Sequence, residues 1–106
     1  MSIRPYILSE NNWLSVKDQQ YDLAILPWGA TEPHNYHLPF GTDSIQSGYL
    51  ASESAALAWQ KGTRAIVLPT IPWGVNTGQT DLKLCLNIIK RECGYQYTKK
   101  PDGNKK

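Results

Sequence analysis

Residues 21–43 read YDLAILPWGATEPHNYHLPFGTD. The first part, residues 21–27, is a continuous apolar segment of strand length bounded by Gly29, which is typical of a buried strand. The second part, residues 32–43, places two carboxylates and two imidazoles in a loop directly after that strand. Carboxylate oxygens and imidazole nitrogens are ligands that suit zinc, manganese and similar divalent ions. This stretch therefore predicts a metal site at the end of a strand.

Three residues of the loop are candidate metal ligands. In an extended backbone alternate side chains point to the same side, so Glu32 and His34 can reach one place. Pro33 lies between them, and its fixed φ disfavours a helix there. Residues 39–42, PFGT, contain the turn residues that would bring Asp43 back to the same place. We predict Glu32, His34 and Asp43 as metal ligands, and these residues alone identify no catalytic group.

Other roles are open for the same residues. Asp43 lies in a Thr-Asp-Ser sequence before an apolar-periodic segment, so it also has the spacing of a helix cap, which is compatible with ligation. A single loop histidine or surface glutamate needs no metal, and only the joint spacing of Glu32, His34 and Asp43 favours one. His37 either orients a ligand or bonds to the backbone to hold the loop, and we favour the second role.

The flanking segments predict a strand-helix-strand unit. Residues 44–61 have helical spacing of apolar residues, and Gly62 follows where a C-cap belongs. Residues 64–69, RAIVLP, form a second buried-strand pattern, so the connection should cross over right-handed. Residues 9–17 begin with a capping type of residue and predict a short helix.

This topology places the loop at a sheet edge where ligands bind. Open parallel sheets collect ligands at the carboxyl ends of their strands. The segment after the second predicted strand, residues 71–79, would lie along the same rim. Trp28 and Trp73 would then either line a substrate pocket or pack in a core or an interface.

Composition indicates one cytoplasmic domain. The 106 residues carry a net charge of only +2, which does not argue for a nucleic-acid partner. Cys85 and Cys93 lack C-x-x-C spacing, so reduced thiols are expected. The sequence has no leader-type N-terminus and no apolar run of about 18 residues that could span a bilayer. We therefore expect no membrane association.

The C-terminal part has a different character. Residues 81–89, DLKLCLNII, predict a strand or the start of a helix. Residues 90–106 are polar and lysine-rich, and we expect a disordered tail after a domain of residues 1–89. A reading frame cut short or shifted near residue 87 is our interpretation of this change.

The string GATEPHNYHLPFGTD, residues 29–43, resembles the G-[ST]-x-E-x-H-x-x-H-L-P-x-x-T-D signature of the creatininase (creatinine amidohydrolase) family. The resemblance covers about residues 1–87. It implies an α/β fold of the three-layer α/β/α type with a mainly parallel sheet, of which this chain would carry an incomplete N-terminal β-α-β portion. It also implies hydrolysis of a C–N bond in amides, often cyclic ones, with two divalent ions, Zn or Mn. Glu32 would then ligate one ion, His34 the other, and Asp43 would bridge them.

The resemblance also has limits. Family members are typically well over twice as long, and their second half supplies another His and Glu ligand and an N-G-H-G-G-N segment. No histidine follows His37 in this chain. Many relatives carry a Glu-His pair after a P-x-G turn, where this chain reads IPWGVNTGQ at residues 71–79.

From these departures we expect an amidohydrolase of the family, truncated and inactive alone, with a small-molecule amide as substrate and fewer ions than in the family, or none. The alternatives are a non-catalytic metal-binding module and a structural fragment that needs a partner half. Assembly into a homo-oligomer is a further expectation.

Overall fold

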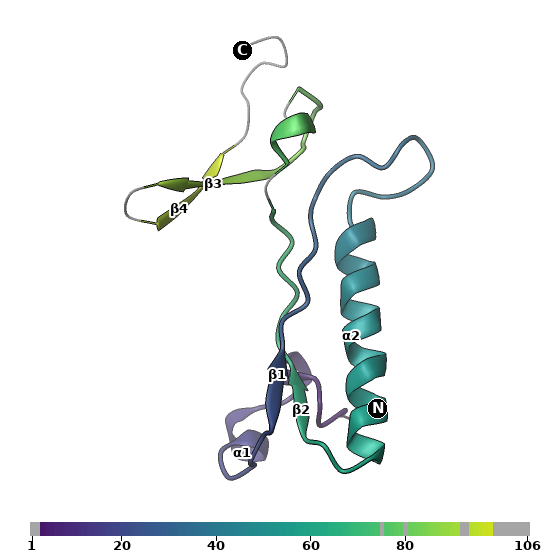
Figure 1. Cartoon of the computed structure of the whole chain (residues 1–106), viewed down its shortest axis with the longest axis vertical. Coiled ribbons are helices and arrows are strands. Elements are labelled where there is room, and N and C mark those ends of the chain that lie inside the picture. Colours follow the sequence, from purple (N-terminus) through teal and green to yellow (C-terminus); the bar gives the residue numbers. More distant parts are fainter. Residues whose placement is uncertain (1–2, 75, 80, 92–93, 99–106) are drawn as a thin grey trace.

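The computed structural model describes residues 3–74, 76–79, 81–91 and 94–98 (Figure 1). Its elements in chain order are the 3-10 helix η1 (Leu8–Glu10), helix α1 (Trp13–Val16), strand β1 (Leu23–Ile25), helix α2 (Thr42–Gln60), strand β2 (Ala65–Val67), the 3-10 helix η2 (Thr77–Gln79), and strands β3 (Asn87–Arg91) and β4 (Gly94–Thr98).

Strands β1 and β2 form a parallel sheet, and α2 connects them along the chain. The register pairs Leu23 with Ala65 and Ile25 with Val67. On the other side of β2, Ile7 forms an isolated parallel bridge with Val67. The predicted β-α-β unit of a partial α/β fold is therefore confirmed, and α2 runs alongside the two strands in Figure 1.

Helix α2 ends as the sequence predicts. Gly62 follows its last turn with a φ of +94°, the left-handed region that glycine adopts at helix ends. The amides of Gly62 and Thr63 donate to the carbonyls of Trp59 and Ala58 at 3.1 and 2.9 Å. This cap turns the chain from the helix directly into β2.

The buried core between helix and sheet is small. Its buried members are short or aliphatic: Ile7, Ala51, Ala55, Ala65 and Val67. Trp59 packs against this cluster, and its indole Nε1 donates to the Ala65 carbonyl at 2.7 Å. The radius of gyration is 17.2 Å, against roughly 13 Å for a compact chain of about 100 residues. The described residues therefore make an extended unit around a small core.

Two predicted elements differ in detail. The strand predicted as buried over residues 21–27 is ordered only as Leu23–Ile25, and Leu23 is 46% exposed. Ala24 is also exposed and Ile25 is half-buried, so the predicted buried pattern is wrong for all of β1. Among the described strands only β2 pairs with β1, which leaves β1 at an edge. The helix predicted over residues 9–17 is split into η1 and α1. Asn12 rather than Ser9 caps α1, by accepting from the Ser15 amide at 3.1 Å.

The C-terminal part contains an antiparallel pair of strands. Strand β3 crosses the expected domain boundary at residue 89 and pairs with β4 from Asn87↔Thr98 to Arg91↔Gly94. Residues 90–91 and 94–98 of the expected tail thus lie in β3 and β4. Gly94 followed by YQYT carries the aromatic and β-branched content of a strand, and the surrounding lysines obscured that signal. The remainder of that expected tail, residues 92–93 and 99–106, lies outside the described residues.

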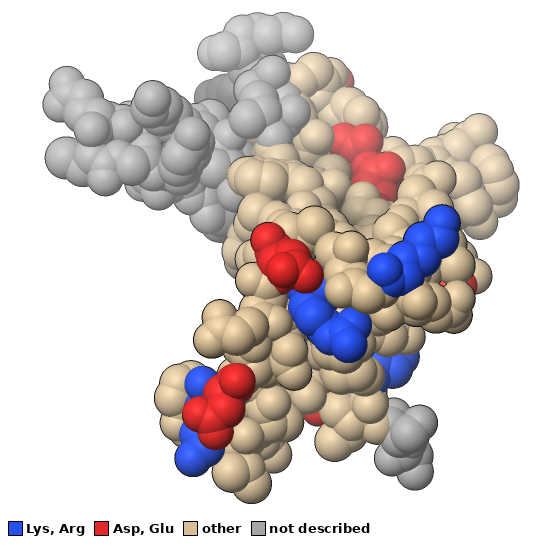
Figure 2. Space-filling model, turned by 60° about the horizontal axis from the view of Figure 1, so that its bottom comes forward, with Lys and Arg blue, Asp and Glu red and all other residues tan. Residues whose placement is uncertain are grey.

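Within the described ranges, no helix is long and apolar enough to cross a membrane. On the face shown in Figure 2, acidic and basic side chains lie singly or in small mixed groups, with wide uncharged surface between them.

Candidate metal centre

The backbone beyond β1 and β2 stays paired and carries the candidate ligands to one rim. Trp28 and Ile71 form a parallel bridge. The Gly29 amide donates to the Ile71 carbonyl at 2.7 Å, and the Ile71 amide donates to Pro27 at 3.0 Å. Glu32 therefore follows a segment that the neighbouring strand's continuation holds in place.

Gly29 lets the start of helix α2 approach this segment closely. A Cβ on Gly29 would lie 2.4 Å from Ser44 Oγ and 2.6 Å from Ser44 Cα, which is closer than real Cβ contacts. The adjacent hydroxyl of Ser47 donates to the Trp28 carbonyl at 3.0 Å. The glycine of the motif thus sets the distance between the strand's end and the helix turn that carries Asp43.

Two turns bring the loop back from His34 to Asp43. Asn35 adopts a φ of +60°, which asparagine tolerates, and His34 then pairs with Leu38 in an antiparallel bridge. The Thr42 amide donates to the Pro39 carbonyl at 3.1 Å. The second of these turns lies where the sequence predicts the return.

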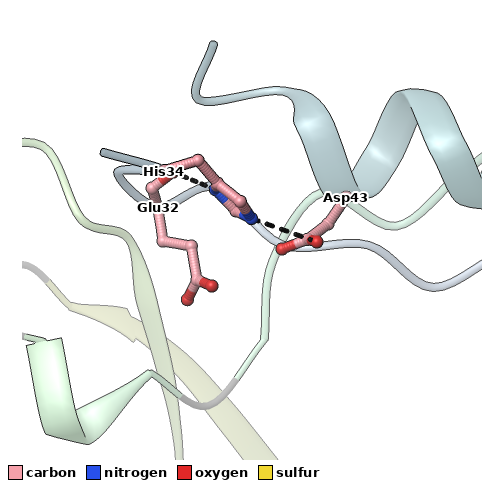
Figure 3. Close-up of side chains that lie close together, drawn as sticks. All are labelled: Glu32, His34 and Asp43. Atoms are coloured by element: carbon pink, nitrogen blue, oxygen red, sulfur yellow. Dashed lines mark hydrogen bonds and ion pairs between the residues drawn. The ribbon is translucent and has the colours of Figure 1, made fainter. Parts of the chain in front are cut away.

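Asp43 lies in the first turn of α2, but its side chain is not the cap. The N-cap residue is Gly41, which makes no side-chain cap hydrogen bond. The Asp43 Oδ1 instead lies 3.3 Å from His34 Nε2 (Figure 3). Its charge is still favourable beside the positive end of the helix dipole.

Glu32, His34 and Asp43 come together as Figure 3 shows, all three partly buried. One potential ligand atom from each residue lies within 4.8 Å of the other two. The side chains of His34 and Asp43 are 22% and 35% exposed. The structure therefore brings all three predicted ligands into one cluster.

A backbone hydrogen bond orients the His34 ring for ligation. The Nδ1 of His34 lies 3.1 Å from the Glu32 carbonyl oxygen, which can only accept, so Nδ1 carries the proton. The Nε2 lone pair of the neutral ring is then left facing Asp43. Ligating histidines are commonly held in this way through their other nitrogen.

The same contacts set the proton affinity of His34. The hydrogen bond with the Glu32 carbonyl raises the pKa of His34, and partial desolvation opposes this change. The neighbouring Asp43 carboxylate raises that pKa further. Without an ion, His34 therefore binds a proton more tightly in this cluster than a free imidazole does in water.

The donor set, and the spacing of two of its members, suit a divalent metal ion. Two ligands at about 2.1 Å from a tetrahedral ion lie roughly 3.4 Å apart. The 3.3 Å between His34 Nε2 and Asp43 Oδ1 matches that separation. One nitrogen and two carboxylates also suit zinc or manganese better than the softer ions that prefer thiolates.

The other residues singled out in the sequence lie outside the cluster. His37 is exposed, and its ring has no hydrogen bond with any described residue, so the favoured backbone contact is not seen. Trp28 and Trp73 are 60% and 43% exposed, and the Trp28 indole donates to the Trp73 carbonyl at 2.8 Å. Neither tryptophan lines the shallow hollow beside the start of α2, which is formed by Leu38, Pro39, Thr42, Ile45 and Gln46.

Sequence reasoning placed Asn76 along the rim but missed its hydrogen bonds and the part of Leu86 and Asn87. The Leu86 amide donates to the Thr31 carbonyl at 3.0 Å, directly before Glu32. Asn76 and the buried Asn87 connect the same region through their side-chain amides. Asparagines in loops are common, so only the tertiary contacts distinguish these two.

A parallel β-α-β unit with a carboxylate and imidazole cluster at the carboxyl end of its first strand defines a protein of the α/β class with a candidate metal site. The family model of creatininase, creatinine amidohydrolase, matches residues 9–92. The chain therefore belongs to the creatininase family, as the motif at residues 29–43 indicates.

A solved structure gives the same result. The crystal structure of a "Putative creatinine amidohydrolase" from Bacteroides fragilis is 43% identical and superposes with a TM-score of 0.74. The match covers 85% of this chain and 36% of the Bacteroides chain, so this chain spans about a third of that relative. No curated protein matches the sequence significantly.

Proposed function

We propose that this chain binds divalent metal ions through Glu32, His34 and Asp43, as part of a site that hydrolyses a C–N bond of a small amide. The observation that carries the proposal is the convergence of three ligand atoms within 4.8 Å of one another. Membership of the creatininase family supports the choice of reaction. Zinc or manganese is the proposed ion, since both accept this donor set.

Each side chain has a distinct part in this proposal. Glu32 and Asp43 supply negative charge that offsets the charge of the ions. His34 supplies Nε2, while its protonated Nδ1 donates a hydrogen bond to the Glu32 carbonyl. When bound, the ions supply Lewis-acid polarisation of the amide carbonyl and activation of water near neutral pH.

Metal titration of ligand variants tests the assignment. Asp43→Ala and the isosteric Asp43→Asn should weaken Zn²⁺ or Mn²⁺ binding by at least about 100-fold, since even the partners of ligands contribute 10- to 100-fold. Calorimetry with each metal alone measures this change. Glu53→Ala is the matched control, because Glu53 is an exposed carboxylate of the same helix outside the cluster. Unchanged affinity in Asp43→Ala would show that the ligand assignment is wrong.

Catalysis, in this proposal, needs groups beyond the aligned portion. The match covers 36% of the Bacteroides chain, and the family resemblance implies further His and Glu ligands in the part not covered. We therefore propose that residues 1–106 supply only part of the catalytic groups and need the remaining part of the family fold for activity. Mixing this chain with the uncovered portion of the Bacteroides protein should produce amide hydrolysis that Asp43→Ala abolishes.

A non-catalytic metal-binding module is the second candidate. The convergence of three ligand atoms from this chain alone favours it, because metal binding needs no group from elsewhere. Under this function the chain binds metal, and the mixture hydrolyses no amide or lactam. A cytoplasmic location belongs to either proposal, supported by the free and buried thiol of Cys85.

A further inference from the structure

A buried asparagine lies outside the ligand cluster and has no part in the proposed chemistry. Asn87, the first residue of β3, is 3% exposed. Its side-chain Oδ1 accepts from the Asn76 amide at 2.6 Å. A buried amide costs free energy unless it is hydrogen-bonded, so this contact specifies where residue 76 lies.

From Asn76 a chain of hydrogen bonds leads to the residue before Glu32. Asn76 Nδ2 donates to the Leu86 carbonyl at 2.8 Å, and the Leu86 amide donates to the Thr31 carbonyl at 3.0 Å. The Thr31 hydroxyl in turn donates to the Pro72 carbonyl at 2.7 Å. Segments far apart in the sequence are thus joined behind Glu32 in one continuous network.

We propose that Asn87 and Asn76 are positioning residues for the ligand Glu32. This inference rests on the proposed metal function and deepens it. The network fixes the backbone at Thr31, so only the side-chain torsions of Glu32 remain to be fixed when an ion binds. Without these hydrogen bonds, the backbone before Glu32 is less restrained. Metal binding must then offset the conformational entropy that is lost when Glu32 is ordered.

The test compares three asparagine variants. Asn87→Ala removes the acceptor, and Asn76→Ala removes the donor to Leu86 while keeping the backbone amide that reaches Asn87. Asn12→Ala is the matched control, because the Asn12 side chain also accepts from a backbone amide but caps α1 instead. For each variant we would measure Zn²⁺ affinity by calorimetry, the visible spectrum with Co²⁺, and the rate of hydrogen exchange at the Leu86 amide.

Both network variants should weaken Zn²⁺ binding by about 10-fold, as outer partners of ligands do. They should also change the Co²⁺ spectrum and speed exchange at Leu86, while Asn12→Ala alters none of the three. Wild-type affinity and spectrum in folded Asn76→Ala would overturn the inference, as would an equal loss in Asn12→Ala. If Asn87→Ala does not fold, Asn76→Ala decides.

The proposed function fails in a different way. A wild-type chain that binds neither Zn²⁺ nor Co²⁺ would overturn the metal function itself. Leu86 exchange needs no metal, so it still shows whether Asn87 holds the tie to Thr31. Unchanged exchange in both network variants would overturn the positioning inference whatever the wild type binds.

Discussion

His34 contacts the backbone through one ring nitrogen and offers the other to the proposed metal ion. One ring nitrogen is bound by the Glu32 carbonyl, and the other faces Asp43. The first contact selects the tautomer suited to ligation, and the second places a carboxylate beside the free nitrogen. A proton and a metal ion therefore compete for the same Nε2.

We expect His34 to make the stability of the metal-free protein depend on pH. The Glu32 carbonyl raises the pKa of folded His34 above its ordinary value of 6.5, and Asp43 adds to the effect. The resulting stability is fully present below the unfolded pKa and is lost as pH rises through the folded pKa. The difference in Tm between wild type and His34→Gln, measured in chelator, should shrink over that window. A difference that is constant or grows with pH would contradict this prediction.

The relation between β1 and α2 sets the geometry of the cluster. Glu32 and His34 lie on the chain leaving the strand, and Asp43 lies in the first turn of the helix. These elements approach closely at Gly29 and Ser44. Because backbone atoms of Ser44 fill the space, a side chain at residue 29 must displace the helix.

Gly29→Ala should therefore destabilise the protein by about 1–3 kcal/mol, the usual cost of overpacking. The new Cβ would meet Ser44 N at 2.8 Å as well as Ser44 Cα at 2.6 Å. Gly78→Ala is the control, since a Cβ there meets nothing within 4 Å. Urea unfolding of both variants measures the effect. Equal stability of the two would show that the strand and helix can separate without loss.

The whole molecule exposes apolar surface on both sides of its small core. On β1, Leu23 is 46% exposed, and Leu26 just beyond the strand is 44% exposed. On the outer side of α2, Leu57 is 59% exposed. Among the described strands β1 pairs only with β2, so its other edge is available for a further strand. We propose that these surfaces take part in the expected assembly with another copy of this chain.

We expect the isolated chain to self-associate through the β1 side. Leu23→Lys should weaken association roughly 10-fold, because a buried leucine contributes about 1.5–3 kcal/mol. Sedimentation velocity over a range of concentrations measures this effect. Leu57→Lys is the comparison variant on the outer side of α2. If Leu57→Lys disrupts association and Leu23→Lys does not, the helix rather than the sheet edge carries the contact.

Local chemistry allowed much of the fold and site to be predicted from the sequence. Glycine at residue 62 ends α2 because it adopts a positive φ, and the apolar segments before and after that helix form parallel strands. The ligand types and their spacing predicted a cluster of Glu32, His34 and Asp43, which the structure brings together. The helix end and the ligand cluster each depend on residues close together in the chain, and each strand segment is apolar by itself.

Tertiary structure decided which of the open roles each side chain takes. Asp43 faces His34 instead of capping α2, because the loop's two turns bring the ring to the helix. Asn87 acts on Thr31 through Asn76 and Leu86, a connection that no spacing in the sequence indicates. The exposure of Leu23 likewise depends on which strands pair with β1. Such contacts join distant segments, and only the folded chain brings their partners together.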